Sequence, residues 1–314
     1  MRPSSARIVV YGAGSLGSLV GGLLHHHRHD VTLVGRDPHV AAVRESGLRV
    51  VTPDDEFTVE VAATTEGTDL DADLALVTVK AFDTESAARD LASGTFEAVC
   101  SLQNGMGNEA TLAQFLDCPV YAGSITYGAI LREPGLVECT GVGELVFGPH
   151  EGGDGPFDDA LETMFRDGGI VTELAADMPR RLWEKLAVNA GINTVTALAD
   201  VDNGDLLSGT AHGLATDAAR ETARVARGHD VALSNRDAVA AVESVAEATA
   251  ANTSSMRQDI HAEKRTEVDA ITGYVVDRAA EIRDADVAVP VCKTTTRLLR
   301  SWEEARELRA ERAE

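Results

Sequence analysis

The sequence predicts an α/β domain over residues 1–177 followed by an all-α domain over residues 178–314. Three observations support this division. Short apolar runs alternate with helix-period segments up to about Pro149, a glycine-rich loop follows the first apolar run, and strand-like alternation stops near Met178. The length suits two domains of ordinary size better than one core.

Five apolar runs in the first domain are short, nearly continuous and rich in β-branched residues. They are Ile8–Tyr11, Val31–Val34, Leu74–Val79, Ala98–Leu102 and Val120–Ile125. Such runs are typical of a parallel sheet covered by helices on both faces. The helix-period segments Leu16–Leu24 and Thr84–Leu91 complete the βαβ rhythm.

The end of the first domain has a different pattern. Glycine and proline punctuate residues 131–147, which predicts short hairpins at the sheet edge. One more helix and strand are expected over residues 157–174. Met178-Pro179 is the expected boundary, because proline suits the start of a helix and biases the residue before it to extended geometry.

The formal net charge of -23, with 51 acidic residues, narrows the range of partners. A surface this acidic repels nucleic acid and anionic membranes, so neither is expected as a partner. Arginine supplies most of the positive charge, since the lysines are Lys80, Lys185, Lys264 and Lys293. This composition indicates a halophilic protein from a cytosol of high salt, where screening makes the self-repulsion tolerable; an acidic mesophilic enzyme is the alternative.

The cysteines Cys100, Cys118, Cys139 and Cys292 are scattered, which predicts neither a metal site nor a disulfide framework. We expect them to be core residues in a reducing compartment. No signal peptide or membrane-spanning run is visible, so a cytoplasmic protein is expected. The histidine-rich stretch 25–29 is interpreted as a solvated helix end, and no bound metal is expected.

The loop after the first predicted strand carries the pattern G-x-G-x-x-G. Its residues are Gly12, Ala13, Gly14, Ser15, Leu16 and Gly17. The first glycine allows a tight turn, the second lets the backbone approach a pyrophosphate, and the third lets the helix pack on the strand. The preceding strand and following helix predict a Rossmann domain that binds a dinucleotide; a glycine-rich turn without a ligand is the alternative.

Arg36 stands at the end of the second predicted strand, where dinucleotide sites read the ribose. A guanidinium there can bind a 2′-phosphate, which favours NADP(H). Asp37 is one residue away and could instead favour NAD(H). Arg36 could also be a solvated loop charge.

Lys185, Asn189 and Asn193 are four residues apart in the second domain. On a helix this spacing places them on one face, roughly 6 Å from one to the next. An ammonium and two amides beside apolar neighbours suit a small carboxylated or hydroxylated substrate. A salt-bridged lysine with two hydrogen-bonded core amides is the alternative.

A second polar cluster lies further along the chain, over residues 252–267. Ser255 with Gln258 matches a capping box, so Ser255 is an expected helix cap. Glu267 could be a surface acid paired with Arg265 or with a neighbouring residue. If one unbroken helix held Ser255 and Glu267, they would be roughly 18 Å apart, too far to share a small ligand.

With these motifs the chain resembles the ketopantoate reductase (2-dehydropantoate 2-reductase) family over nearly its whole length. The resemblance rests on segments whose order and spacing match together: Gly12–Gly17, the strand ending in Lys80, Gln103–Gly107, Gly123–Ala129, Lys185 with Asn189 and Asn193, Asn203-Gly204, and Asn252–Met256 leading to Thr266-Glu267. It implies an all-α second domain like the C-terminal domain of 6-phosphogluconate dehydrogenase.

The resemblance also implies an NADPH-dependent oxidoreductase that reduces 2-dehydropantoate to pantoate in pantothenate and coenzyme A biosynthesis. It implies that Lys185 is the proton donor and Glu267 an acid at the junction of cofactor and substrate. The cofactor would contact Lys80, Asn104 and Ala129, and the substrate Asn104, Asn189, Asn193, Asn203, Asn252 and Ser255. A reductase of another 2-keto acid and a non-catalytic NADP-sensing module are the alternatives, and either a monomer or a homodimer is compatible with the sequence.

Overall fold

The computed structural model describes residues 5–282 and 287–309. By backbone contacts the chain forms two compact units. Unit 1 holds residues 1–103 and 108–178, and unit 2 holds residues 104–107 and 179–314. The short segment 104–107 therefore packs with the helical residues although both of its neighbours along the chain belong to unit 1.

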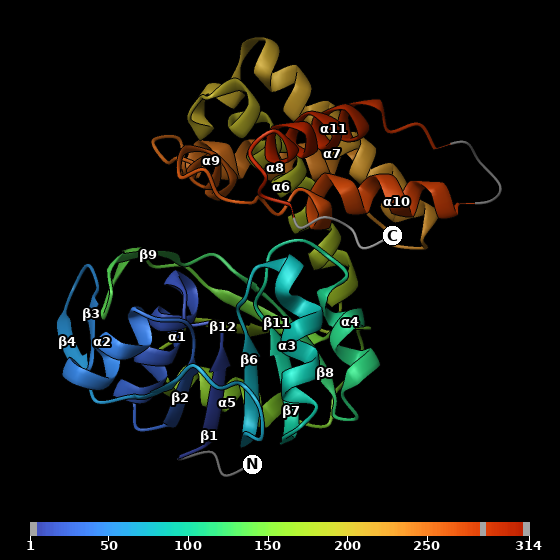
Figure 1. Ribbon diagram of the computed structural model, residues 1–314. Helices are drawn as coiled ribbons and strands as arrows, with labels where there is room; N and C mark the ends of the chain where they lie inside the picture. The colour runs from blue at the N-terminus through green and yellow to red at the C-terminus, as the bar shows by residue number, and fades with distance from the viewer. Residues whose placement is uncertain (1–4, 283–286, 310–314) are drawn as a thin grey trace. The chain divides into compact units, whose positions relative to one another are not determined.

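Unit 1 is built on an eight-stranded sheet of order β12-β11-β8-β7-β6-β1-β2-β5 (Figure 1). All neighbouring pairs are parallel except β11 with β8. The bounds are β1 Arg7–Tyr11, β2 Asp30–Val34, β5 Ala62–Thr64, β6 Asp71–Val77, β7 Thr95–Ser101, β8 Val120–Ile125, β11 Leu145–Pro149 and β12 Thr172–Leu174. The predicted parallel strands are confirmed, and β6 ends two residues earlier than expected.

Helices connect these strands and cover the sheet. Their bounds are α1 Ser15–His26, α2 His39–Ser46, the short 3-10 turn η1 Ala81–Asp83, α3 Thr84–Leu91, α4 Asn108–Phe115 and α5 Asp158–Asp167. The apolar side chains of the strands fill two clusters, which include Leu33 and Leu76 in one and Ala75 and Val99 in the other. This two-sided burial explains why the strands read as nearly continuous apolar runs.

A second sheet of four strands, ordered β4-β3-β10-β9, was not expected. Its bounds are β3 Leu48–Val51, β4 Glu56–Val59, β9 Gly128–Glu133 and β10 Leu136–Gly141. The prediction of hairpins at the edge of the main sheet was therefore wrong in part. β9 and β10 form a hairpin, but it belongs to this second sheet, whereas β11 joins the main one.

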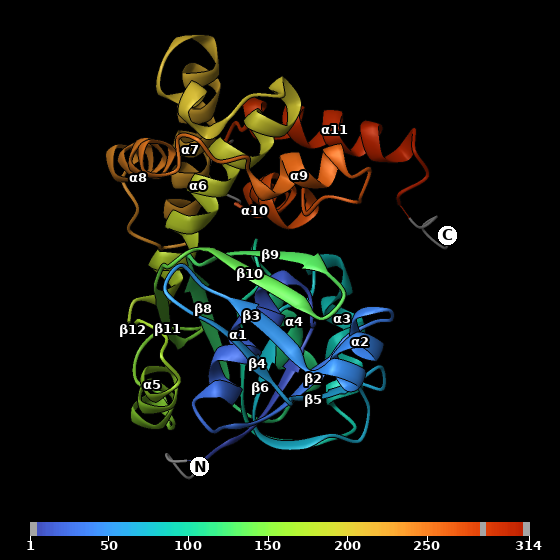
Figure 2. The same cartoon turned by 90° about the vertical axis from the view of Figure 1, so that its left-hand side faces the viewer.

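Helix α1 lies between the two sheets (Figure 2), and two adjacent glycines allow this. A Cβ on Gly21 would lie 2.5 Å from Leu33 of the main sheet. A Cβ on Gly22 would lie 2.7 Å from Val50 of the second sheet. The close approach of both sheets leaves no room for a larger side chain at these two positions.

Unit 2 is helical in its described part. The bounds are α6 Met178–Ala199, the 3-10 turn η2 Asn203–Leu207, α7 Gly209–Gly228, α8 Asn235–Ala248, α9 Ser255–His261, the π-helical turn η3 Asp269–Gly273, α10 Tyr274–Glu281 and α11 Pro290–Glu304. One apolar cluster joins them, with many alanines at the contact between α7 and α8. Alanine-rich faces let helices approach closely, which explains the composition of this half of the chain.

The remaining structural expectations have mixed outcomes. The four cysteines are free, and three of them are buried as expected. The stretch 25–29 contains the end of α1, and residues 26–28 are exposed as expected. His29 is the exception: it is buried and accepts a hydrogen bond from the Ala6 backbone nitrogen. Among the described residues no group of histidine, cysteine and acidic side chains could hold a metal ion. No helix in residues 5–282 and 287–309 has the length and apolar character to span a membrane.

Candidate active site

The turn Gly12–Gly17 connects β1 to α1, and two of its glycines have no room for a side chain. Gly12 has a φ of +117°, and a Cβ there would lie 2.7 Å from the Val79 backbone nitrogen. A Cβ on Gly17 would lie 2.3 Å from the Gly12 carbonyl oxygen. The turn is thus packed against the end of β6, as the motif requires.

Gly14 differs from these two glycines. The nearest atom to a Cβ there, the Gly12 carbonyl oxygen, would be 4.0 Å away. Gly14 is the residue before α1, and no side chain caps this helix. An open backbone at the positive end of a helix suits a phosphate group.

Ser15 fixes the second sheet to the same turn. Its Oγ accepts a hydrogen bond of 3.0 Å from the Leu131 backbone nitrogen of β9. Ala129, expected near the nicotinamide, lies on this strand two residues earlier. The structure therefore brings the Ala129 strand to the first turn of α1.

Arg36 follows β2 by two residues, and its side chain is 87% exposed. Its Nη2 lies 3.1 Å from Oδ2 of Asp83, in the turn η1 that follows Lys80. The guanidinium is accessible to a phosphate, although a carboxylate holds it in this structure. Lys80 itself precedes η1 in extended conformation.

A buried polar network that the sequence analysis missed links the loops after β6 and β7. Nε2 of Gln103 donates to the Val79 carbonyl at 3.1 Å and to Oγ1 of Thr84 at 2.7 Å. Thr84 donates in turn to Oδ1 of Asn108 at 2.9 Å. In the sequence, the only indication of this network was that polar residues follow the apolar strands. The network fixes the loop that begins with Asn104.

The segment 104–107 packs tightly within unit 2. A Cβ on Gly105, which has a φ of +80°, would lie 2.5 Å from the Ala270 Cβ. The Met106 backbone nitrogen donates to the Ala270 carbonyl at 3.0 Å. Asn104 is therefore carried by a segment that contacts η3, the turn that begins two residues after Glu267.

Helix α6 carries the row of Lys185, Asn189 and Asn193 on one face, as the spacing predicts. Nζ of Lys185 and Nδ2 of Asn189 are both inaccessible to solvent. Nδ2 of Asn189 has no hydrogen-bond partner among the described residues. Most neighbours of the row along the helix, such as Leu186 and Ile192, are buried in the apolar cluster.

The loop 249–255 meets the end of this row. Nδ2 of Asn193 lies 3.5 Å from Oγ of Ser255, a long hydrogen bond. The Asn203 backbone nitrogen donates to the Asn252 carbonyl at 3.2 Å. The structure thus brings four of the expected substrate residues together in two pairs.

Ser255 does not cap α9, which corrects the expectation from the capping box. Ser254 is the cap: its Oγ accepts from the Arg257 backbone nitrogen at 3.2 Å and lies 2.7 Å from Oγ1 of Thr196. Ser255 is the first helical residue, and its hydroxyl lies toward Asn193. Only Ser255 has the Gln of a capping box three residues later, since Arg257 follows Ser254 at that spacing; the hydroxyl of Ser254 caps the helix and contacts Thr196 instead.

Glu267 is buried, with 6% of its surface exposed. The alternative that it is a surface acid was therefore wrong. Arg265 forms an ion pair with Asp269. Helix α9 ends at His261, so Ser255 and Glu267 do not share one helix and the 18 Å separation does not apply.

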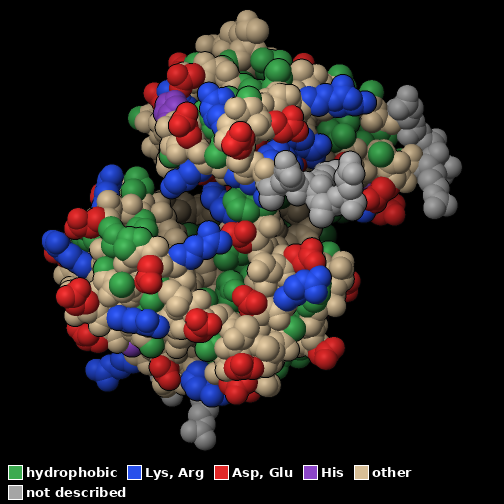
Figure 3. Space-filling model, viewed as in Figure 1, with side chains coloured by type: hydrophobic (Ala, Val, Ile, Leu, Met, Phe, Trp, Pro, Cys, Tyr) green, Lys and Arg blue, Asp and Glu red, His purple; other side chains and the backbone are tan. Residues whose placement is uncertain are grey.

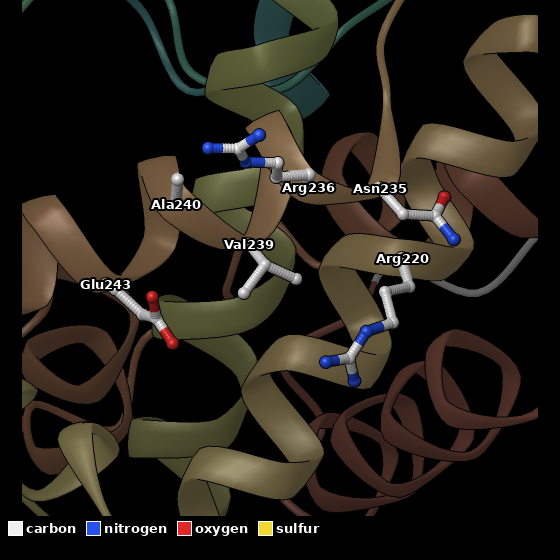
Figure 4. Close-up of a pocket in the computed structure, with 6 residues that line it drawn as sticks. All are labelled: Arg220, Asn235, Arg236, Val239, Ala240 and Glu243. Atoms are coloured by element: carbon white, nitrogen blue, oxygen red, sulfur yellow. The ribbon is translucent and has the colours of Figure 1, made fainter.

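The helical unit has a surface pocket of about 320 Å³ between α7 and α8 (Figure 4). Arg220 and five α8 residues, among them Arg236 and Glu243, line it. Arg220 donates to Asp217 on its own helix, and Glu243 pairs with His212. The pocket contains none of the expected site residues.

Charges near the surface of unit 1 are mixed. On the face in Figure 3, Lys and Arg side chains are scattered among Asp and Glu and form no continuous basic patch. This distribution fits a small anionic ligand better than a polyanion.

Two family models match the chain. "Ketopantoate reductase PanE/ApbA" matches residues 8–152, and "Ketopantoate reductase PanE/ApbA C terminal" matches residues 177–303. Together they span most of the sequence. This chain belongs to the ketopantoate reductase family.

Members of this family with similar sequences include the 2-dehydropantoate 2-reductase of Halobacterium salinarum. It is 44% identical over 300 residues, which are 94% of this chain and 98% of the relative. The 2-dehydropantoate 2-reductase of Archaeoglobus fulgidus is 38% identical over 281 residues, 88% of this chain and 91% of the relative.

Solved structures with the same fold include a PanE/ApbA family ketopantoate reductase from Ralstonia eutropha JMP134. It is 31% identical, with a TM-score of 0.87 over 96% of this chain and 99% of that one. A D-mandelate dehydrogenase, solved with NADH and anilino(oxo)acetate, is 27% identical with a TM-score of 0.87 over 96% and 100% of the two chains. The predicted family and fold class are confirmed.

The two kinds of glycine in the turn predict a large and a small loss of stability when a methyl group is added. Gly12→Ala should lower the free energy of unfolding by about 2 kcal/mol or more, because it combines an unfavourable φ with a backbone clash. Gly14→Ala should lower it by less than about 1 kcal/mol, because the space is open. Denaturant unfolding at one salt concentration measures both, and equal losses would contradict this description of the turn.

Proposed function

We propose that this protein reduces 2-dehydropantoate to pantoate with NADPH, a step of pantothenate and coenzyme A biosynthesis. The observation that carries the proposal is the row of Lys185, Asn189 and Asn193 on α6, with Ser255 beside it, in a chain 44% identical to a 2-dehydropantoate 2-reductase. The row supplies an ammonium and amides at the spacing of one helical face.

The glycine turn supports the binding of the dinucleotide. Gly14 leaves open space beside the uncapped start of α1, where backbone N–H groups can hold the pyrophosphate. Arg36 would bind the 2′-phosphate of NADP(H) by exchanging its contact with Asp83. Lys80, Asn104 and Ala129 would line the nicotinamide end, with Ala13, Ser15, Leu16 and Gly17 completing the turn.

The reaction needs a hydride at C2 of the keto acid and a proton at the oxygen of the former carbonyl group. When bound, NADPH supplies the hydride from C4 of its nicotinamide. Lys185 would hold its ammonium at the carbonyl oxygen, stabilise the negative charge that develops there and donate the proton. The low solvent access of its Nζ strengthens both interactions, because water does not screen them.

The substrate's carboxylate and hydroxyl need several hydrogen-bond partners. Nδ2 of Asn189 and Oδ1 of Asn203 are buried, and within the described residues neither has a hydrogen-bond partner. A buried polar atom without a partner costs free energy, and a bound ligand can remove that cost. We propose that these amides, with Asn193, Asn252, Ser255 and Asn104, hold the substrate, and that Glu267 lies where substrate and cofactor meet.

A second candidate is the NADH-dependent reduction of another 2-keto acid. The similarity to a D-mandelate dehydrogenase solved with NADH favours it, because the fold is shared at a TM-score of 0.87. Asp37, directly after Arg36, is the residue that could favour NADH.

A substrate panel separates the two candidates. Initial rates are measured with NADPH and with NADH on 2-dehydropantoate, pyruvate and 2-ketoisovalerate, at low and high salt. The proposal expects the highest kcat/KM for 2-dehydropantoate with NADPH, and retained activity at high salt. A higher kcat/KM for a keto acid without the hydroxyl would favour the second candidate, and tight NADPH binding without any turnover would contradict both.

Lys185→Ala should lower kcat by about 100-fold or more, because it removes the partner of the developing alkoxide. The affinity for NADPH, measured by fluorescence titration, should change little. Lys293→Ala is the matched control, since that lysine is exposed on α11. Near-wild-type turnover of Lys185→Ala would exclude the lysine as the proton donor.

Arg36→Ala should weaken NADPH binding by about tenfold and NADH binding far less, because only NADPH carries the phosphate. Arg49→Ala, which removes the exposed ion pair with Glu56, should leave both affinities unchanged. Dissociation constants from titration at constant salt measure the difference. Equal weakening of both cofactors by Arg36→Ala would show that Arg36 does not read the phosphate.

A further inference from the structure

Helix α11 ends in a carboxylate that is completely buried. Glu303 has none of its surface exposed. Its Oε1 accepts hydrogen bonds from the Thr266 backbone nitrogen at 2.8 Å and from Oγ1 of Thr266 at 2.5 Å. Its Oε2 accepts from Nη1 of Arg309 at 2.5 Å. One oxygen therefore connects α11 to Thr266 on a distant turn, and the other binds Arg309.

Arg309 extends this connection to a second acid. Its Nη2 lies 2.6 Å from Oδ2 of Asp269, whose Oδ1 accepts from Nε of Arg300 at 2.7 Å. Burial alone would raise the pKa of Asp269, but the hydrogen bonds from Arg309 and Arg300 hold it below its ordinary value. Asp269 is thus charged at neutral pH, and the network of Glu303, Arg309, Asp269 and Arg300 alternates in sign.

A buried carboxylate is retained at a cost unless its partners compensate for lost hydration. Replacement of such a pair by apolar residues is often neutral or stabilising, so stability alone does not explain it. What the network does is fix the backbone on both sides of Glu267. Thr266 is held by Glu303, and the Glu267 carbonyl accepts from the backbone nitrogens of Ala270 at 3.1 Å and Ile271 at 3.2 Å.

The same turn also holds the segment that carries Asn104. The Ala270 carbonyl accepts from the Met106 nitrogen, and Gly105 packs against Ala270. A displacement of the turn would therefore move Glu267 and the Asn104 segment together. Asp269, one residue before Ala270, is fixed by Arg300 and Arg309.

We propose that Glu303 is a positioning residue for the reaction, which sets the orientation of Glu267 through its two hydrogen bonds to Thr266. This inference rests on the proposed function, because it assigns Glu267 to the site where substrate and cofactor meet. Glu303 has no direct role in the chemistry, since Thr266 and Arg309 occupy both of its oxygens.

The test uses a matched pair of buried glutamates, Glu303 on α11 and Glu221 on α7, which both accept hydrogen bonds from backbone nitrogens. Glu221 is also buried, and it accepts from the Val291 and Cys292 backbone nitrogens at the first turn of α11. Glu303→Gln should lower kcat/KM for 2-dehydropantoate by about tenfold or more, because small displacements of reacting groups have large effects on rate. Glu221→Gln should leave kcat/KM unchanged, even if both variants unfold at lower temperature.

A double-mutant cycle with Glu267→Gln identifies the route of the effect. If Glu303 acts through Glu267, the double variant should have the kcat/KM of Glu267→Gln alone. Amide hydrogen exchange should also become faster over residues 266–271 in Glu303→Gln and stay unchanged there in Glu221→Gln. Additive losses in the cycle would overturn the proposal. Equal kcat/KM in Glu303→Gln and Glu221→Gln would also overturn it.

Two further outcomes keep the inference separate from the proposed function. If the wild-type protein reduces no 2-keto acid, the proposed function fails, and the exchange measurement alone decides whether Glu303 fixes the turn. If Glu303→Gln does not fold, Thr266→Val replaces it, because this change removes only the hydroxyl that donates to Glu303. Wild-type kcat/KM and wild-type exchange in Thr266→Val would overturn the positioning role.

Discussion

The central constraint in this protein is the burial of a row of polar side chains on helix α6, among apolar residues of the same helix. Lys185, Asn189 and Asn193 lie on one face of α6, and the Lys185 Nζ is inaccessible to solvent. An ammonium in such a place loses hydration, which costs folding free energy unless polar or anionic groups compensate. In the function proposed here that cost has a use, since the same site must stabilise negative charge on a substrate oxygen.

The loops that carry the other proposed site residues are each held by specific contacts within their own unit. The glycine turn packs closely against the residues after β6, where Gly12 leaves no room for a side chain. The Asn104 segment is held by its contact with Ala270. The turn with Glu267 is held by Glu303. Short loops that carry reactive groups need such support, because a loop alone does not keep a side chain within the tolerance that catalysis demands.

Features with a local cause could be predicted from the sequence. The strands of the main sheet were visible as apolar runs, the glycine turn as a spacing, and the polar row on α6 as a four-residue repeat. The second sheet was missed because β9 is only half-buried and reads as loop, and because β3 and β10 pair across more than 80 residues of chain. The choice between Ser254 and Ser255 as helix cap, and the contact of Glu303 with Thr266, also depend on packing between distant segments. Spacing along the chain carries no signal for such contacts.

The most direct test of the central claim is a crystal structure of the protein with NADP⁺ and 2-dehydropantoate bound. The distance to measure is that from Nζ of Lys185 to the C2 oxygen of the substrate. We expect Nζ of Lys185 within about 3 Å of the substrate's C2 oxygen, a hydrogen-bond distance. We also expect the amides of Asn189 and Asn193 to contact the same substrate molecule. A substrate bound with its C2 oxygen away from Lys185, held by other residues, would contradict the central claim.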